Sequence, residues 1–361
     1  MTIMDYKKIT RVITPVCAGL MCSFSSHAVS DADDMPSIDC TDKKVQLEVL
    51  GALANQLTEQ YIFLDKAKAF TNYVSELPAK SEFSQVKDCQ GFTRVINDTL
   101  LSITSDKHLH INFSPYVIPE DTPESKQAFA KREQAFMQSL NFGFEKVERL
   151  PFNIGYINMT LFAPTEHGAH QLESAMNLLG YTNALIIDLR ESRGGAPAMV
   201  DLLTSYFVDG RTNTSNIYYR NRDYTEERYT TTDVNGKHYG QERPLYILTS
   251  NATFSAAEDL AYTLKHLGRA TIIGEVTGGG AHPGEVFRLT AHFDGFIPNG
   301  RSINPVTNTN WEGVGVQPDI ETEVDKALNV AQQKILASFK NKEPNLARAN
   351  RMQKRIERLK G

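Results

Sequence analysis

The sequence lacks the features of several large protein classes. After residue 24 it has no apolar stretch near the ~20 residues that a transmembrane helix needs. A formal charge of −5 over 361 residues gives no electrostatic basis for binding phosphates. No Cys/His cluster has zinc spacing, and no acidic loop resembles a calcium site. We therefore expect no membrane span, no nucleic-acid partner, no metal and no other cofactor.

The N-terminus has the pattern of a secretory signal peptide. Three basic residues precede a short apolar run, Val12 to Phe24, and the small residues Ser26 and Ala28 suit the −3 and −1 positions of a cleavage site. The run is about half as long as a membrane span, so we interpret it as a cleaved signal and not as an anchor. Residues 1–28 would be removed, and the protein would be exported to the periplasm or secreted.

The sequence has only four cysteines, and Cys17 and Cys22 would leave with the signal peptide. Cys40 and Cys89 remain as an even pair in an exported chain, which favours a disulfide. The bridge would close a loop of about fifty residues. The alternative is two buried free thiols.

The remaining chain divides into four segments by its hydrophobic pattern. Residues 29–118 carry apolar residues at three- and four-residue spacing and predict a small helical domain, and residues 119–148 suit a linker or surface helix. From 149 to 325, short β-rich runs alternate with helical stretches, which indicates an α/β core with a largely parallel sheet. Residues 326–361 predict a basic C-terminal helix, with ten Lys/Arg against two Glu.

One short polar corner, in "LTSNATFSAAED" (residues 248–259), allows two interpretations. Ser255 and Glu258 before an apolar-periodic helix form a capping-box pattern. A helix N-terminus also stabilises developing negative charge, so Ser255 could act as a nucleophile with the amide of Ala256 aimed at an oxyanion. Both interpretations require the same local geometry.

Two further motifs carry residues that a serine nucleophile would need. In "DLRESRGG", Gly194 and Gly195 follow an apolar strand and could turn backbone amides toward an oxyanion, or they could simply form a turn. We expect Asp188 and Arg190 in the same stretch to form a structural ion pair.

A catalytic base could come from three histidines. "SDKHLHI" supplies His108 and His110, "GGGAHPG" supplies His282, and "WEGVGVQPD" adds Glu312, which could orient an imidazolium. The residues alone do not choose among the three histidines.

Taken together, "ALIIDLRESRGG", "LTSNATFSAAEDLAYTLKHLGRATIIGEVTGGGAHPG" and "INPVTNTNWEGVGVQPDI" resemble the S41 family of serine peptidases. That family includes the tail-specific (C-terminal processing) proteases, the tricorn protease and the repeats of interphotoreceptor retinoid-binding protein. "DKHLHINF" resembles the family's Asp-x-His segment. The resemblance implies an α/β fold with a crotonase-like β/α superhelical core over 149–325, preceded by the small helical domain.

The resemblance also implies roles for individual residues. Ser255 stands at the position of the nucleophile, and Gly194 or Gly195 with the amide of Ala256 stands at the oxyanion hole. The tail-specific branch uses a lysine base, but Gly280 occupies that position here. Lys265 is no substitute, because it follows ten residues later on the same helix.

The tricorn-like branch instead uses a histidine before the sheet domain and a glutamate near the end of the core, and His108 and Glu312 match these positions. We therefore expect a Ser255-His108-Glu312 arrangement in which Glu312 raises the pKa of His108. His110 and His282 are the reserve candidates for the base.

The chain departs from the processing proteases because it has no PDZ-like stretch, so selection of protein C-termini is not implied. Its "GGGAHPG" segment is similar to the retinoid-binding repeats, which gives the alternative of a hydrophobic-ligand carrier for retinoids or fatty acids. An inactive interaction scaffold is a third hypothesis. A peptidase would act on peptides or unfolded proteins, and the sequence leaves its cleavage preference and oligomeric state open.

The signal-peptide interpretation predicts that the mature chain begins at Val29. The intact mass of the protein recovered from the periplasm or the medium should match cleavage after Ala28, because the small residues at −3 and −1 fit a signal peptidase. Retention of Met1 in the exported material would contradict the interpretation.

Overall fold

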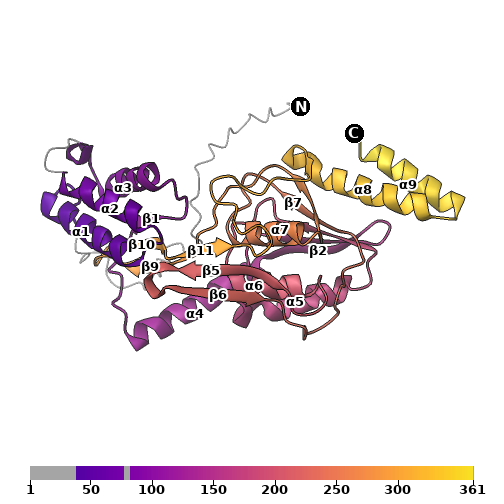
Figure 1. Cartoon of the computed structure of the whole chain (residues 1–361), viewed down its shortest axis with the longest axis horizontal. Helices are drawn as coiled ribbons and strands as arrows, with labels where there is room; N and C mark the ends of the chain where they lie inside the picture. Colours follow the sequence, from indigo (N-terminus) through magenta and orange to yellow (C-terminus); the bar gives the residue numbers. More distant parts are fainter. Residues whose placement is uncertain (1–37, 77–81, 361) are drawn as a thin grey trace, which may run out of the picture.

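The computed structural model describes residues 38–76 and 82–360, and the predicted signal peptide lies outside them. The described chain is a mixed α/β structure built around one central sheet, with a group of N-terminal helices at one end and the C-terminal helices at the other (Figure 1). Among the helices in these ranges, none combines the length and the apolar composition needed to cross a membrane.

The central sheet has six strands, and it agrees with the largely parallel sheet that the sequence predicts. Only the pairing of β2 with β3 is antiparallel. In spatial order the strands are β12 (Ile320–Glu321), β8 (Thr271–Gly274), β7 (Leu245–Thr249), β4 (Ala184–Asp188), β3 (Ile154–Met159) and β2 (Phe144–Leu150).

Helices cover both faces of this sheet because its strands alternate two buried sets of side chains. In β4, Leu185 and Ile187 are buried with the residues of α5 (Thr165–Leu179), α6 (Pro197–Ser205) and α7 (Ala256–His266). The intervening residues, Ala184 and Ile186, are buried with those of α8 (Ala327–Lys342) and α9 (Leu346–Arg358). The strands therefore carry apolar residues on both faces, as parallel strands do.

The C-terminal segment forms two helices where the sequence analysis expected one. The break between α8 and α9 falls at Pro344, and Glu343 has the extended conformation that a residue before proline prefers. Both helices bury apolar residues against the sheet, among them Ile335 and Met352. The segment is therefore part of the core packing, with its basic residues mostly outside.

The N-terminal helices are α1 (Lys43–Gln60), α2 (Leu64–Ser75) and α3 (Cys89–Thr104), with a short 3-10 turn at Glu82–Gln85. The side chains of Asp42 and Asp88 cap α1 and α3 by accepting hydrogen bonds from backbone amides in the first turn. The buried residues of α1 recur at three- and four-residue spacing, as the sequence pattern predicts.

These helices pack against a small antiparallel sheet of β1 (His110–Phe113), β10 (Phe293–Pro298) and β9 (Gly284–Arg288). Strands β9 and β10 come from the 149–325 segment, yet Phe293 and Ile297 share one hydrophobic cluster with Leu53 and Phe92 of the helices. The helical segment and the α/β core are thus joined through this sheet, and the joint lies next to the segment that carries His108.

The remaining elements lie around the central sheet. A third sheet consists of β11 (Gly300–Ile303), β5 (Asn213–Tyr219) and β6 (Tyr224–Tyr229). Helix α4 (Pro123–Ser139) lies in the segment 119–148 that the sequence suggests as a linker or surface helix, and most of its residues are exposed.

The predicted disulfide between Cys40 and Cys89 is present. It fixes the residues just before α1 to the first residue of α3, 49 positions later. Both cysteines are buried in the cluster that holds the helices on the small sheet.

We expect the mature chain to show no free thiol when it is denatured without reduction, and two after reduction. Replacing Cys40 and Cys89 together with serine should lower the free energy of unfolding by ~4 kcal/mol on loop-entropy grounds, measured by urea titration. Two free thiols before reduction would rule out the bridge.

Candidate active site

Ser255 lies at a strained corner between β7 and α7. Its backbone has φ 57° and ψ −125°, whereas an ordinary N-cap residue takes an extended conformation with negative φ. A non-glycine residue in this region costs about 1–3 kcal/mol and persists only where the surroundings enforce it. The amide of Phe254 donates to Ser192 O (3.1 Å), which fixes the corner to the loop that carries Gly194. A serine presented on a strained strand-to-helix turn is a recurring arrangement for nucleophiles.

Gly194 lies directly against Ser255. A Cβ atom at Gly194 would be 2.6 Å from Ser255 Cβ and 2.8 Å from the amide nitrogen of Ala256, and Gly194 has φ +96°. Gly195 is equally confined, since its Cβ would be 2.2 Å from Phe162 O. Only glycine fits at either position, so the Gly-Gly pair has a steric role beyond that of a simple turn.

Three backbone amides at or next to this corner have no hydrogen-bond partner among the described residues. The amides of Gly194, Gly195 and Ala256 form no hydrogen bond with any residue between 38 and 76 or between 82 and 360. Ala256 is the first residue of α7, where amides have no acceptor within the helix. The structure thus places Gly194 and the amide of Ala256 beside Ser255, and Gly195 follows Gly194 in the chain and lies against Phe162.

Glu258 connects this corner to the glycine-rich loop. Its side chain is fully buried, and it accepts hydrogen bonds from the amides of Ser255 (2.9 Å), Gly279 (2.7 Å) and Gly280 (2.9 Å) and from the hydroxyl of Thr277 (2.5 Å). Burial raises the pKa of Glu258 to about 7, while four donors favour its ionised form. The Glu258 half of the predicted capping box is therefore formed, and the same carboxylate also positions the loop.

His108 is buried beside the corner. Its ring packs against Phe254, the residue before Ser255, with ring centroids 4.5 Å apart. Neither ring nitrogen has a hydrogen-bond partner among the described residues. Burial lowers the pKa of His108 to about 4, so the expectation that Glu312 raises this pKa is wrong. At pH 7 the ring is neutral and can accept a proton.

Glu312 contacts a different histidine from the expected one. Its Oε2 atom accepts a hydrogen bond from the amide of Ala281 (2.6 Å) and lies 3.4 Å from His282 Nδ1. Its Oε1 atom is buried and has no partner in the described chain. No hydrogen bond joins Glu312 to His108, whose ring nitrogens have no partner, and Glu312 lies instead against the loop that carries His282.

Asp106 is a residue that the sequence analysis did not assign. It is almost completely buried and accepts hydrogen bonds from the amide of His108 (2.9 Å), from His282 Nδ1 (2.9 Å) and from the hydroxyl of Tyr61 (3.1 Å). The only signal for it in the sequence was the Asp-x-His spacing within "DKHLHINF". Asp106 joins the segments of His108 and His282 to the end of α1.

The side chain of His110 contacts its own chain segment and the neighbouring strand β10, and not Ser255. Its Nδ1 atom bonds to His108 O (2.7 Å), and its ring stacks on Phe296 with centroids 6.0 Å apart. Burial lowers its pKa as well. His110 therefore packs within the small sheet, and these contacts favour a structural role for it.

Comparison with known proteins bears on this arrangement. Residues 153–322 match the sequence profile of peptidase family S41. The resemblance to family S41 is confirmed. The chain is 33% identical over 144 residues to the carboxyl-terminal-processing protease of Synechocystis sp., a match that covers 38% of this chain and 31% of that protein. The chain therefore matches about a third of the length of this curated relative.

Solved structures support the fold. The structure of a lipoprotein from Streptococcus agalactiae matches with a TM-score of 0.57 at 14% identity. The match covers 80% of this chain and 95% of the lipoprotein chain. The structure of a putative peptidase from Parabacteroides merdae matches with a TM-score of 0.50 at 19% identity. This match covers 77% of this chain and 90% of the peptidase chain. At such identities the likeness shows a shared fold alone.

The lysine position of the tail-specific S41 branch cannot hold a side chain here. A Cβ atom at Gly280 would be 2.1 Å from Phe254 Cζ and 2.7 Å from His108 Cε1. The two rings occupy the space in which a lysine side chain would begin. Position 280 therefore has no room for a side chain, in agreement with the glycine found where the resemblance would put the lysine.

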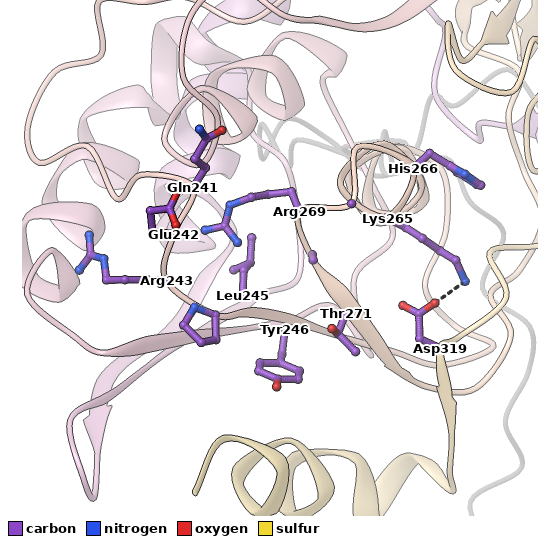
Figure 2. A pocket seen from close by; sticks show the side chains of 13 residues that line it. Gln241, Glu242, Arg243, Leu245, Tyr246, Lys265, His266, Arg269, Thr271 and Asp319 are labelled. Carbon is purple, nitrogen blue, oxygen red and sulfur yellow. Dashed lines mark ion pairs between the residues drawn. The ribbon is translucent and has the colours of Figure 1, made fainter. Parts of the chain in front are cut away.

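Lys265 lies at the other end of α7. Its Nζ donates to Gln317 O (2.6 Å). It also pairs with Asp319 (2.9 Å), as Figure 2 shows. It lines a cavity of about 570 Å³ that also contains Leu245 and Thr271, the first residues of β7 and β8. Ser255 follows the opposite end of β7, so neither Lys265 nor this cavity belongs to the site.

Asp188 and Arg190 form the expected structural ion pair. Arg190 Nε lies 2.8 Å from Asp188 Oδ1, and the same carboxylate accepts a hydrogen bond from the hydroxyl of Tyr156 (2.7 Å). The guanidinium also donates to Val324 O (2.6 Å), which ties the end of β4 to the segment before α8.

Replacing Gly194 with alanine should place a methyl group in the space next to Ser255 and the amide of Ala256. The added methyl group would collide with Ser255 and displace an oxyanion donor, so we expect hydrolysis of an unstructured peptide to fall by about 10²–10³-fold. Gly210→Ala is the matched control, because Gly210 also has positive φ (+75°) but nothing within 4 Å of its Cβ position. Equal rates in the two variants, both folded by circular dichroism, would contradict the geometry.

Proposed function

We propose that this chain is an exported serine-type peptidase that hydrolyses peptide bonds in peptides or unfolded proteins. The observation that carries the proposal is the corner at Ser255. A strained serine lies against Gly194, and the amides of Gly194, Gly195 and Ala256 have no partner among the described residues. A residue that only caps a helix needs neither a strained backbone nor a glycine packed against it. The chain matches only part of its curated relatives, so their activity is extended to it here as a proposal.

The geometry supports an acyl-transfer mechanism. Ser255 Oγ attacks the carbonyl carbon of the scissile bond while its proton passes to His108, and the carbonyl electrons move onto oxygen. The amides of Gly194 or Gly195 and of Ala256 stabilise the resulting oxyanion. The oxyanion electrons then re-form the carbonyl as the C–N bond breaks, and the imidazolium of His108 protonates the leaving amine. Water next attacks the acyl carbon while His108 takes one of its protons, and His108 returns that proton to Ser255 Oγ as the ester bond breaks.

We favour His108 as the base and keep His282 and His110 as reserve candidates. His108 is neutral, lies against Phe254, and has two unpartnered ring nitrogens. An unpartnered buried polar atom costs about 1–3 kcal/mol, which a site can recover when substrate binds. Glu312 Oε1 also has no partner among the described residues, and catalytic hydrogen bonds are often long or poorly aligned before substrate arrives. We therefore retain Ser255-His108-Glu312 as the proposed catalytic set.

The finer description of the fold and of its location belongs to the same proposal. We infer that the α/β core is crotonase-like and that α1–α3 form a small domain before it, which the likeness to the Streptococcus agalactiae structure supports. Export to the periplasm or medium is supported by the pattern of residues 1–28 and by the Cys40–Cys89 disulfide, since disulfides persist in oxidising compartments.

The carrier hypothesis has no comparable support. The cavity of about 570 Å³ is lined by charged side chains that include Arg243, Arg269 and Asp319 (Figure 2). An apolar ligand would need a predominantly apolar lining.

We expect Ser255→Ala and His108→Ala each to lower kcat for an unstructured peptide by at least about 10³-fold, and the double variant to be little worse, because members of a triad act as a unit. Lys265→Ala is the control and should leave the rate nearly unchanged, because Lys265 pairs with Asp319 far from the corner.

The same series tests the choice of base. Full activity in His108→Ala together with a large loss in His282→Ala would transfer the role to His282. Full activity in Ser255→Ala would end the peptidase proposal.

A further inference from the structure

Three side chains with metal-binding atoms meet between the N-terminal helices and the core. Asp106 follows α3, His282 lies in the loop after β8, and Glu312 lies between β11 and β12. One ligand atom from each lies within 4.8 Å of the others. His282 Nδ1 is 2.9 Å from Asp106 Oδ2 and 3.4 Å from Glu312 Oε2. Neighbouring ligands of a tetrahedral zinc ion, with bonds of about 2.0 Å, are about 3.3 Å apart. The two distances from His282 Nδ1 are close to this spacing, and Asp106 and Glu312, whose ligand atoms are at most 4.8 Å apart, would adjust around the ion.

Neighbouring groups orient each of the three side chains. The hydroxyl of Tyr61 and the amide of His108 donate to Asp106, and the amide of Ala281 donates to Glu312. The His282 ring packs edge-on against Phe63, with centroids 5.1 Å apart. Metal ligands are characteristically held by such outer contacts.

The charge of this cluster is unbalanced. Two carboxylates face one histidine, and the side chains of Asp106, His282 and Glu312 are 1%, 5% and 19% exposed. The neighbouring Lys107 directs its Nζ to the carbonyl of Gly278. Glu312 Oε1 is buried and lacks a partner within the described chain. A buried excess of negative charge is costly, and a divalent cation would remove that cost.

We propose that Asp106, His282 and Glu312 form a binding site for one Zn²⁺ ion, which replaces the proton on His282 Nδ1. The donor set of one imidazole and two carboxylates suits zinc, whereas Mg²⁺ and Ca²⁺ take oxygen ligands almost alone. The three residues are separated by 176 and 30 positions, which is why no zinc spacing is visible in the sequence.

Zinc at this site would have two consequences. It would cross-link the segment after α3 to two loops of the core and so stabilise the folded chain by mass action. It would also hold Glu312 against His282, away from His108, and so inhibit hydrolysis. This second consequence rests on the proposed function, whereas zinc binding itself does not.

The test is calorimetric titration of the tag-free, chelator-treated chain with ZnCl₂, in parallel with fluorescence of Trp311. Trp311 is the only tryptophan in the sequence and precedes Glu312, so its emission reports on the site directly. We expect one ion per chain with Kd of about 1 μM or tighter, and no response to MgCl₂ or CaCl₂ at the same concentrations.

Variants locate the ion. His282→Ala and Glu312→Gln should each weaken binding by at least about 10–100-fold. His266→Ala is the matched control, because it removes a histidine at the far end of α7 and should leave Kd unchanged. Two substitutions at the cluster, one of them nearly isosteric, keep the test decisive if either variant fails to fold.

Several results would overturn the zinc site. These are no saturable binding up to about 1 mM Zn²⁺, an unchanged Kd in His282→Ala and Glu312→Gln, or a loss of binding in His266→Ala. Any of them would leave the cluster as a proton-sharing network only. Because the titration uses no substrate, a chain that binds zinc but hydrolyses no peptide would keep this site and refute only the proposed function.

Discussion

The buried carboxylate of Glu258 is the interaction on which the site depends. It accepts from the amide of Ser255 on one side and from the amides of Gly279 and Gly280 on the other. An uncompensated carboxylate inside the protein would cost several kcal/mol, so its donors must stay in place. The strained conformation of Ser255 and the course of the glycine-rich loop are therefore fixed by one group. That loop in turn leaves room for the rings of Phe254 and His108.

The N-terminal helices contribute to this centre as well as packing on the small sheet. Asp106 follows α3, receives a hydrogen bond from Tyr61 at the end of α1, and holds both His282 and the backbone of His108. The small sheet of β1, β10 and β9 also joins the helices to the core, because its apolar residues pack in the same cluster as those of the helices. The site is thus assembled from chain segments on both sides of the boundary expected at residue 149.

The sequence was sufficient for the features that depend on local geometry. The parallel sheet and the helices follow from periodicity, and the disulfide follows from cysteine pairing. Gly194 lies in a different motif from Ser255 and Ala256, and only the family resemblance predicted that they meet. The partners of Glu312 could not be obtained in this way. Whether Glu312 meets His108 or His282 depends on how two loops pack, and side-chain spacing carries no information on that choice.

The sequence-based prediction for the pKa of His108 was wrong for a related reason. Burial lowers this pKa and outweighs the charge of the neighbouring carboxylate of Asp106.

The most direct test of the central claim is covalent labelling of the nucleophile. The mature chain should be treated with a fluorophosphonate, and the adduct should be mapped by peptide mass spectrometry. The account predicts a single modified residue, Ser255, and no labelling of Ser255→Ala. An unlabelled wild-type protein, or an adduct on another serine, would contradict it.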